Sequence, residues 1–253
     1  MHLLNLGPAL LLLLALLLFV APFVDLPTTR RLKTSSSPKG RSRFYKTVIT
    51  YLWLLAAYAW LFRAGATLRV AHAPTDAPWL FGAPWRTCTI AALVGIFFAL
   101  ALSPGIHCLI RPRKIPAYTR AMSHLSWMLP HDAHQRRWFL ALSITAGVCE
   151  EWILRGVVPH ALHARAGLSL TTALLISSAL FGWNHLYQGL KAVATTALVG
   201  LAFGILSLLC GNLLLPILLH IAMDAQINLS FHPNQLPQAH TPPPTEQASP
   251  SAT

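Results

Sequence analysis

The sequence is poor in charge and above all in acid. Only 10% of its 253 residues are Asp, Glu, Lys or Arg, whereas a soluble domain carries roughly 25%. Seven residues are acidic and 19 are Lys or Arg, which gives a formal net charge of +12. Hydrophobic residues make up 55% of the chain. This composition excludes an ordinary soluble enzyme and indicates an integral membrane protein.

The chain also lacks paired cysteine motifs. Its four cysteines, Cys88, Cys108, Cys149 and Cys210, stand singly in or beside apolar segments without CxxC spacing. Neither a disulfide framework nor a zinc knuckle is therefore indicated. The basic residues cluster in short segments between apolar runs, which is typical of membrane loops. We therefore expect the lipid bilayer as a partner and no nucleic acid.

Repeated apolar stretches predict an all-α, polytopic transmembrane bundle of about seven spans, within a range of six to eight. The predicted spans are about 3–24, 46–63, 88–110, 138–162, 168–187, 190–210 and 212–230. The first could instead be a signal peptide. It lacks a basic start and a small-residue cleavage site, so we expect a retained helix. Pro104 either kinks or ends the third span, and the spacing of Gly200 and Gly204 favours close approach of two helices.

Two basic segments, 25–46 and 111–137, predict the orientation. The positive-inside rule places both on the cytoplasmic side, with the N-terminus outside and the C-terminus inside if seven spans alternate. We expect three regions: N-terminal spans with basic loops at 1–137, a C-terminal core at 138–231, and a Pro-rich disordered tail at 232–253. The expected location is a multi-pass position in a membrane, the plasma membrane if the organism is bacterial.

Two adjacent glutamates lie inside the predicted span 138–162, where a carboxylate costs several kcal/mol. Glu151 and Arg155 are four residues apart, so they share a helix face and can form an ion pair. Glu150 is rotated from Glu151 by roughly 100°. It is then free to face a cavity, where a carboxylate can act as a general base. The alternative for Glu151 and Arg155 is a buried ion pair that only fixes helix packing.

Two further polar pairs stand in later predicted spans. Phe181 and His185 are four residues apart, and so are His220 and Asp224. Taken alone, His185 could be a hydrogen-bonded packing residue, and the last pair could only hold its own helix in place. Polar groups in a membrane bundle converge on its interior or on a water-filled cavity. We therefore predict one site that contains Glu150, His185, His220 and Asp224.

The three motifs, in this order, resemble the CPBP family, which includes type II CAAX prenyl endopeptidases and bacteriocin-processing relatives. The matching residues are Glu150-Glu151-Trp-Ile-Leu-Arg155, Phe181-Gly-Trp-Asn-His185 and His220-Ile-Ala-Met-Asp224, within about 140–230. The resemblance implies an intramembrane endopeptidase with a four-helix catalytic core. It implies that Glu150 activates a water molecule and that His185 assists at the same water. It also implies that His220 and Asp224 stabilise the oxyanion. The expected supporting residues are Glu151, Arg155 and Phe181.

Asp224 departs from the asparagine of the prenyl-protease branch. Asparagine can donate a hydrogen bond to an oxyanion, whereas an ionised aspartate cannot. Asp224 is therefore either protonated, or it orients His220 while that histidine supplies the positive charge. We prefer the second interpretation.

The sequence leaves metal dependence open. Glu150, His185 and His220 could hold zinc with an open fourth position. The chain has no HExxH motif, however, and Glu150 could not be both ligand and base. The sequence establishes no cofactor, and zinc is the divalent metal that remains a candidate. Cys149 could be proposed as a nucleophile, but a thiol in apolar surroundings is usually inert.

The function predicted from these residues is cleavage of a membrane-associated peptide or protein, which could be prenylated, otherwise hydrophobic or secretion-tagged. Two other classes remain as alternatives. A transporter or proton relay also carries acidic and imidazole groups inside the membrane, but it predicts repeats between the two halves, and the polar groups here all lie in the C-terminal half. A non-catalytic scaffold on the same fold predicts that Glu150 is dispensable.

Overall fold

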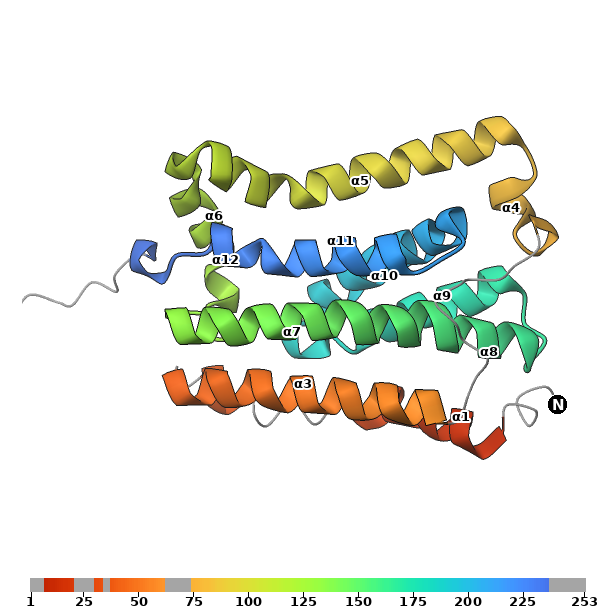
Figure 1. Ribbon diagram of the computed structural model, residues 1–253, viewed down its shortest axis with the longest axis horizontal. Coiled ribbons are helices and arrows are strands. Elements are labelled where there is room, and N and C mark those ends of the chain that lie inside the picture. Colours follow the sequence, from red (N-terminus) through yellow and green to blue (C-terminus); the bar gives the residue numbers. More distant parts are fainter. Residues whose placement is uncertain (1–6, 21–29, 34–36, 62–73, 237–253) are drawn as a thin grey trace, which may run out of the picture.

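The computed structural model describes residues 7–20, 30–33, 37–61 and 74–236, which form helices and no strand (Figure 1). The predicted all-α class is confirmed for these residues. The longer helices are α1 (Gly7–Ala15), α3 (Pro38–Leu61), α5 (Pro84–Ile110), α7 (Ala133–Glu151), α8 (Val158–Ala164), α9 (Leu170–Trp183), α10 (Leu190–Cys210) and α11 (Leu214–Ala225). The short helices are α4 (Pro78–Phe81), α6 (Ile115–Ala121) and α12 (Ile227–Ser230). Two π-helical segments, η2 (Leu16–Val20) and η6 (Trp152–Val157), continue α1 and α7. Single 3-10 turns are η3 (Pro74–Asp76), η4 (Pro112–Lys114), η5 (Ser123–Leu125), η7 (Leu186–Gln188) and η8 (Pro233–Gln235).

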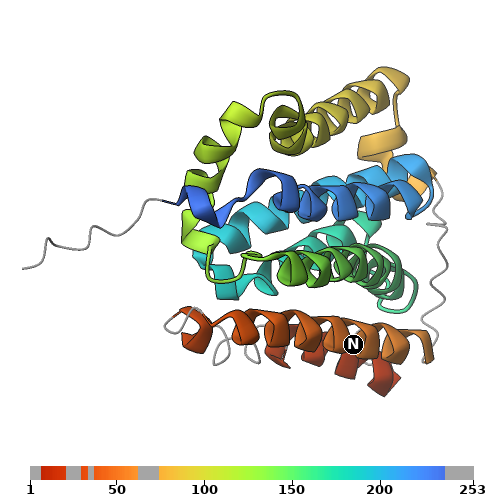
Figure 2. The ribbon, with the colours of Figure 1, turned by 60° about the vertical axis from the view of Figure 1, so that its left-hand side comes forward.

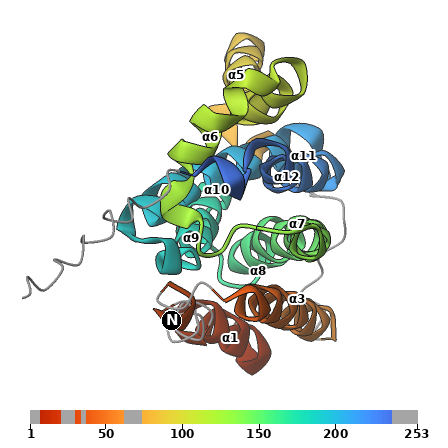
Figure 3. The ribbon, with the colours of Figure 1, turned by 90° about the vertical axis from the view of Figure 1, so that its left-hand side faces the viewer.

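The helices of the C-terminal half form the centre of the bundle. Figures 2 and 3 show α1 and α3 together on one side of this centre and α5 on the opposite side. Between them lie α7 to α11, with α7 next to α3 and α11 on the side of α5 (Figure 3). The N-terminal helices therefore flank the segment that carries the polar motifs.

Among the residues that the structure describes, two helices, α5 and α10, are long and apolar enough to cross a membrane. In their most apolar stretches only 22% of the residues of α5 and 33% of those of α10 are buried. The core helix of a soluble protein is mostly buried, so this exposure favours contact with lipid. The apolar helices 170–183 and 214–230 are shorter. The count of seven spans stays a prediction.

Several helices differ in extent from the predicted segments. The helices α3 and α7 begin at Pro38 and Ala133, before the predicted spans 46–63 and 138–162. The predicted loop 111–137 contains α6, and α5 continues through Pro104 to Ile110. Residues 1–6, 21–29 and 237–253 lie outside the described residues, with parts of the first predicted span, a basic segment and most of the predicted tail. The described parts of both basic segments lie at one end of the bundle (Figure 1).

The side chain of Gln226 repairs the helix at Pro104. The N–H of Gly105 donates to Gln226 Oε1 at 2.9 Å, and Gln226 Nε2 donates to the carbonyl of Ala101 at 2.9 Å. In a regular helix the residues 105 and 101 would bond to each other directly. The amide of Gln226 is inserted between them, and a Cβ at Gly105 would lie 2.8 Å from Gln226 Cβ. This contact attaches α5 to the junction of α11 and α12.

Glycines allow the central helices to approach closely. A Cβ at Gly200 would lie 2.8 Å from Phe181 Cδ1, so α10 can pack on α9 only because this position has no side chain. The close approach predicted from Gly200 is confirmed. On α7, a Cβ at Gly147 would lie 3.2 Å from the carbonyl oxygen of Ile217. This second close approach brings α11 against the turn of α7 that carries the glutamates.

Candidate active site

Glu151 lies in a closed part of the bundle and is fully buried. Its Oε2 is 3.2 Å from Arg155 Nε, as the spacing of the two residues predicts. Its Oε1 lies 2.7 Å from Nδ1 of His220 on α11. A carboxylate that pairs with a guanidinium can only accept, so Nδ1 of His220 is the donor. Both carboxylate oxygens of Glu151 therefore interact with side chains of the protein.

The guanidinium of Arg155 is held by aromatic rings. Its Cζ lies 4.1 Å from the centroid of the Phe181 ring and 5.5 Å from that of Phe203. Neither Nη1 nor Nη2 has a hydrogen-bond partner among the described residues. The faces of the two rings are negative and attract the cation in place of hydrogen-bond acceptors. Phe181 therefore supports the ion pair, as expected, whereas the contact with Phe203 was not predicted.

The π-helical segment η6 follows the two glutamates, and one of its carbonyls is bonded by a side chain of α9. In a π-helix each N–H bonds to the carbonyl five residues earlier. The carbonyl of Leu154 would therefore accept from the N–H of residue 159, which is Pro159. Proline has no N–H. The hydroxyl of Ser177 on α9 donates to the carbonyl of Leu154 instead. The irregular turn that carries Arg155 is thus attached to α9, which also carries Phe181.

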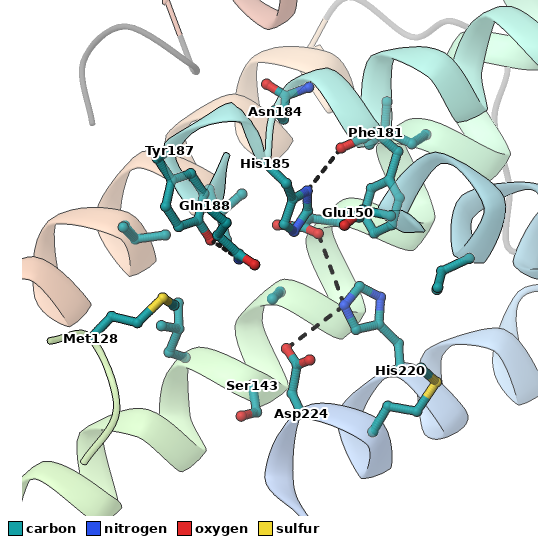
Figure 4. Close-up of a pocket in the computed structure, with 18 of the residues that line it drawn as sticks. Met128, Ser143, Glu150, Phe181, Asn184, His185, Tyr187, Gln188, His220 and Asp224 are labelled. Atoms are coloured by element: carbon teal, nitrogen blue, oxygen red, sulfur yellow. Dashed lines mark hydrogen bonds and ion pairs between the residues drawn. The ribbon is translucent and has the colours of Figure 1, made fainter. Parts of the chain in front are cut away.

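Four predicted residues line one cavity of about 310 Å³ (Figure 4): Glu150 from α7, His185 from the segment after α9, and His220 and Asp224 from α11. The predicted convergence of acid and imidazole groups is confirmed. His220 Nε2 lies 3.9 Å from Glu150 Oε2 and 3.8 Å from Asp224 Oδ2. These separations exceed a direct hydrogen bond and leave room for a bridging water or substrate atom.

His185 stands just past the end of α9, where the chain turns. Its Nδ1 lies 2.8 Å from the carbonyl oxygen of Phe181. A carbonyl can only accept, so Nδ1 carries the proton and Nε2 is the nitrogen left for the cavity. The ring stacks on Tyr187 with centroids 5.9 Å apart. His185 is therefore fixed in one orientation, with an acceptor nitrogen available in its neutral form.

His220 is oriented by Glu151, not by Asp224. The hydrogen bond from Nδ1 to Glu151 is 2.7 Å long, whereas the carboxylate of Asp224 is 3.8 Å from Nε2. The imidazole also stacks on Phe203, with centroids 5.4 Å apart and an angle of 19° between the rings. The preferred expectation that Asp224 orients His220 is thereby corrected. Asp224 instead places its carboxyl group 3.8 Å from Nε2, at the open edge of the ring.

The predicted zinc ligands do not form a metal site. Among the described residues no three His, Cys, Asp or Glu side chains come together as a possible metal-binding group. Glu150, His185 and His220 line the same cavity but do not form such a group. The metal-assisted alternative is not supported, and we derive no step through a metal.

Cys149 does not face the cavity. Its side chain is 1% exposed and packs in the apolar core, and it is not among the residues that line the cavity. A thiol placed in this way cannot reach a substrate held in the cavity.

The family comparison covers the segment that holds these residues. The family model described as "Type II CAAX prenyl endopeptidase Rce1-like" matches residues 133–226. Residues 133–226 are thus similar to the Rce1-like family. The Rce1-like segment begins at the first residue of α7 and ends just before α12, so it contains all three motifs. The resemblance stated from the motifs is confirmed.

One curated relative is itself uncharacterised. A 24.3 kDa protein of Escherichia coli is 30% identical to this chain over 145 residues. The match covers 57% of this chain and 59% of that protein, so the chain spans less than two thirds of its relative. No solved structure matches.

Proposed function

We propose that the protein is an intramembrane endopeptidase that hydrolyses a peptide bond with water activated by Glu150. The observation that carries this proposal is the division of labour between two adjacent glutamates. Glu151 is bonded to Arg155 and His220, whereas Glu150 lines the cavity. A carboxylate in such a cavity, near imidazoles on two other elements, suits general-base catalysis.

In the proposed reaction the oxygen of a water molecule attacks the carbonyl carbon of the scissile bond, and Glu150 takes the proton of that water. The second O–H of the water donates a hydrogen bond to Nε2 of His185 and stays intact, which orients the lone pair of the water oxygen toward the carbonyl carbon. The carbonyl oxygen becomes an oxyanion. The carbon–nitrogen bond then breaks as Glu150 returns the proton to the leaving amine, and a carboxylic acid and an amine result.

His220 is proposed to stabilise the oxyanion. Its Nδ1 donates to Glu151, so in the doubly protonated form Nε2 can donate to an oxygen in the cavity. Donors aimed at a developing oxyanion supply a large part of the catalysis in acyl transfer. Asp224 and Glu150, at 3.8 and 3.9 Å from Nε2, would surround this second proton with negative charge. This proposal replaces an oxyanion contact made by Asp224 itself.

The cavity supports an apolar, membrane-associated substrate. Beyond the polar cluster its lining is mainly apolar and includes Leu52, Leu55, Phe139, Leu142, Ile153 and Val199. Burial of apolar surface would bind a hydrophobic side chain or a lipid modification next to the scissile bond. A prenylated, otherwise hydrophobic or secretion-tagged peptide fits this description.

The test uses the full chain in liposomes with a library of hydrophobic and prenylated peptides. Wild type is expected to release defined fragments, and His185→Ala is expected to cut at least about 100-fold more slowly. Cys149→Ala is the matched control, because it changes the neighbour of Glu150 without altering the cavity. Its rate should equal that of wild type. Absence of cleavage by wild type in every composition would contradict the proposal.

The alternatives predict different outcomes in the same system. A transporter or proton relay would move protons or solutes across the liposome membrane without releasing fragments. A metal-dependent enzyme would lose activity on exhaustive chelation and regain it with zinc. We expect full activity after chelation.

A further inference from the structure

A second pocket, of about 410 Å³, lies between the first turns of α3 and α7. Its lining consists of Pro38, Lys39, Ser42, Arg43 and Lys46 from α3 and Asp132, His134 and Gln135 from the start of α7. Three of these side chains are permanent cations from one helix. The pocket therefore concentrates positive charge where α3 and α7 begin, and these two helix starts lie at the same end of the bundle (Figure 1).

The described part of the chain supplies no ion pair to the cations of this pocket. Lys39 and Arg43 are exposed and have no hydrogen bond or ion pair within the described chain. Lys46 Nζ lies 4.5 Å from the centroid of the Trp138 ring, which leaves its N–H groups free on the other side. The carboxylate of Asp132 caps α7, where it accepts from Gln135 N at 2.7 Å and Gln135 Nε2 at 2.6 Å. The net charge of the pocket therefore suits an external anion.

The same exposed stripe of α3 changes from charged to apolar along the helix. Positions three or four apart on this stripe are Lys39, Arg43, Lys46, Thr50, Trp53, Ala57 and Trp60, and all are exposed. The indoles of Trp53 and Trp60 are 51% and 60% exposed. At 1.5 Å per residue, Trp53 lies about 10 Å along the helix from Lys46. Cations at one end and indoles at the other reproduce the order of headgroup and acyl chain in a phospholipid.

We propose that this pocket and the stripe below it bind one anionic phospholipid, with its phosphate among Lys39, Arg43 and Lys46. Its acyl chain would lie along Trp53. Clusters of cations beside the membrane attract anionic headgroups, and Trp138 has the position expected of an aromatic side chain at the interface. A free phosphate would engage the cations but would leave the apolar stripe uncovered. The proposal concerns a surface outside the cavity and does not rest on the proposed protease activity.

The test compares two lipids on the purified full chain in a neutral detergent at low salt. Phosphatidylglycerol is expected to stay bound in native mass spectrometry and to raise the midpoint of thermal unfolding, and phosphatidylcholine is not. The test variant is Lys39→Gln/Arg43→Gln/Lys46→Gln. Loss of three cations is expected to weaken phosphatidylglycerol binding on the order of 100-fold. The unfolding midpoint without lipid shows that the variant is folded.

A matched control removes the same charge from another place at the same end of the bundle. Arg113, Lys114 and Arg120 are exposed on η4 and α6 and outside the pocket. The variant Arg113→Gln/Lys114→Gln/Arg120→Gln should bind phosphatidylglycerol as wild type does. Equal losses in both triple variants would show only general attraction and would overturn the proposal. Full stabilisation of wild type by inorganic phosphate or glycerol phosphate would also overturn it, because the site would then bind a soluble anion.

Discussion

Glu150 and Glu151 are neighbours in the sequence but belong to two different regions of the molecule. The closed region consists of Glu151, Arg155, Phe181, Phe203 and the Nδ1 edge of His220. The open region consists of Glu150, His185, Asp224 and the Nε2 edge of His220. In the closed region Glu151 is fully buried, with Oε1 in a hydrogen bond to His220 and Oε2 in an ion pair with Arg155. In the open region the side chain of Glu150 is 20% exposed, and that of Asp224 is 40% exposed.

The difference teaches how one histidine can connect a structural ion pair to a reactive cavity. His220 is the side chain shared by both regions, since one ring nitrogen is bonded to Glu151 and the other faces Glu150 and Asp224. The closed region fixes the orientation of the His220 ring, and the Nε2 of that ring is available in the open region. Changes in the closed region should therefore lower stability first, whereas changes in the open region should lower activity first.

The largest stability effect is expected for Glu151→Gln. This change keeps the shape of the side chain but leaves the charge of Arg155 buried without a counter-ion. Removal of one partner of a buried ion pair costs about 3–5 kcal/mol. Thermal unfolding in detergent should show a much lower midpoint than wild type. Glu150→Gln is the matched control and should unfold at a midpoint close to that of wild type. Equal losses of stability in the two variants would contradict the distinction between the closed and the open region.

A smaller loss is expected for Gly200→Ala. The new Cβ would lie 2.8 Å from Phe181 Cδ1 and 3.2 Å from Arg155 Nη2, so it would push apart the ring and the guanidinium of the closed region. Overpacking of this kind costs about 1–3 kcal/mol. Gly95→Ala on α5 is the control, because a Cβ there meets nothing within 4 Å. That variant should be at least as stable as wild type in the same unfolding measurement, since alanine favours a helix over glycine.

The smallest effect is expected for Asp224→Asn, in the open region. Asp224 is partly exposed and makes no short hydrogen bond to His220, so stability should change by less than about 1 kcal/mol. The cleavage rate should stay within about tenfold of wild type, because Glu151 still holds the imidazole. Rates from the peptide assay check this. A loss as large as that of His185→Ala would show that Asp224 itself orients the reaction.

Local spacing was sufficient to predict the open region. The i and i+4 positions of His220 and Asp224 put both on one face of a helix, and the rotation between Glu150 and Glu151 separated their roles. The cost of charge in an apolar bundle then predicted that the polar groups of different helices meet. The general all-α class followed from composition, and helix positions such as 190–210 followed from the apolar runs.

The closed region could not be predicted in full, because its contacts depend on packing between distant segments. The bond between Glu151 and His220 joins residues 69 apart in the sequence. It requires α11 to approach α7 at Gly147, and no local pattern specifies that register. The ring of Phe203 belongs to a third helix and carries no motif. The insertion of the Gln226 side chain into α5 could not be predicted for the same reason. Pro104 indicates only that a backbone group of α5 needs a hydrogen-bond partner from elsewhere.

The central claim is that Glu150 acts on water in the cavity whereas Glu151 only supports the site. The most direct test is the cleavage rate of Glu150→Gln per folded molecule, measured with the peptide that wild type cuts best. We predict an unfolding midpoint and peptide binding close to those of wild type, with a rate lower by about 100- to 10,000-fold. A folded Glu150→Gln variant that cleaves at the wild-type rate would contradict the account.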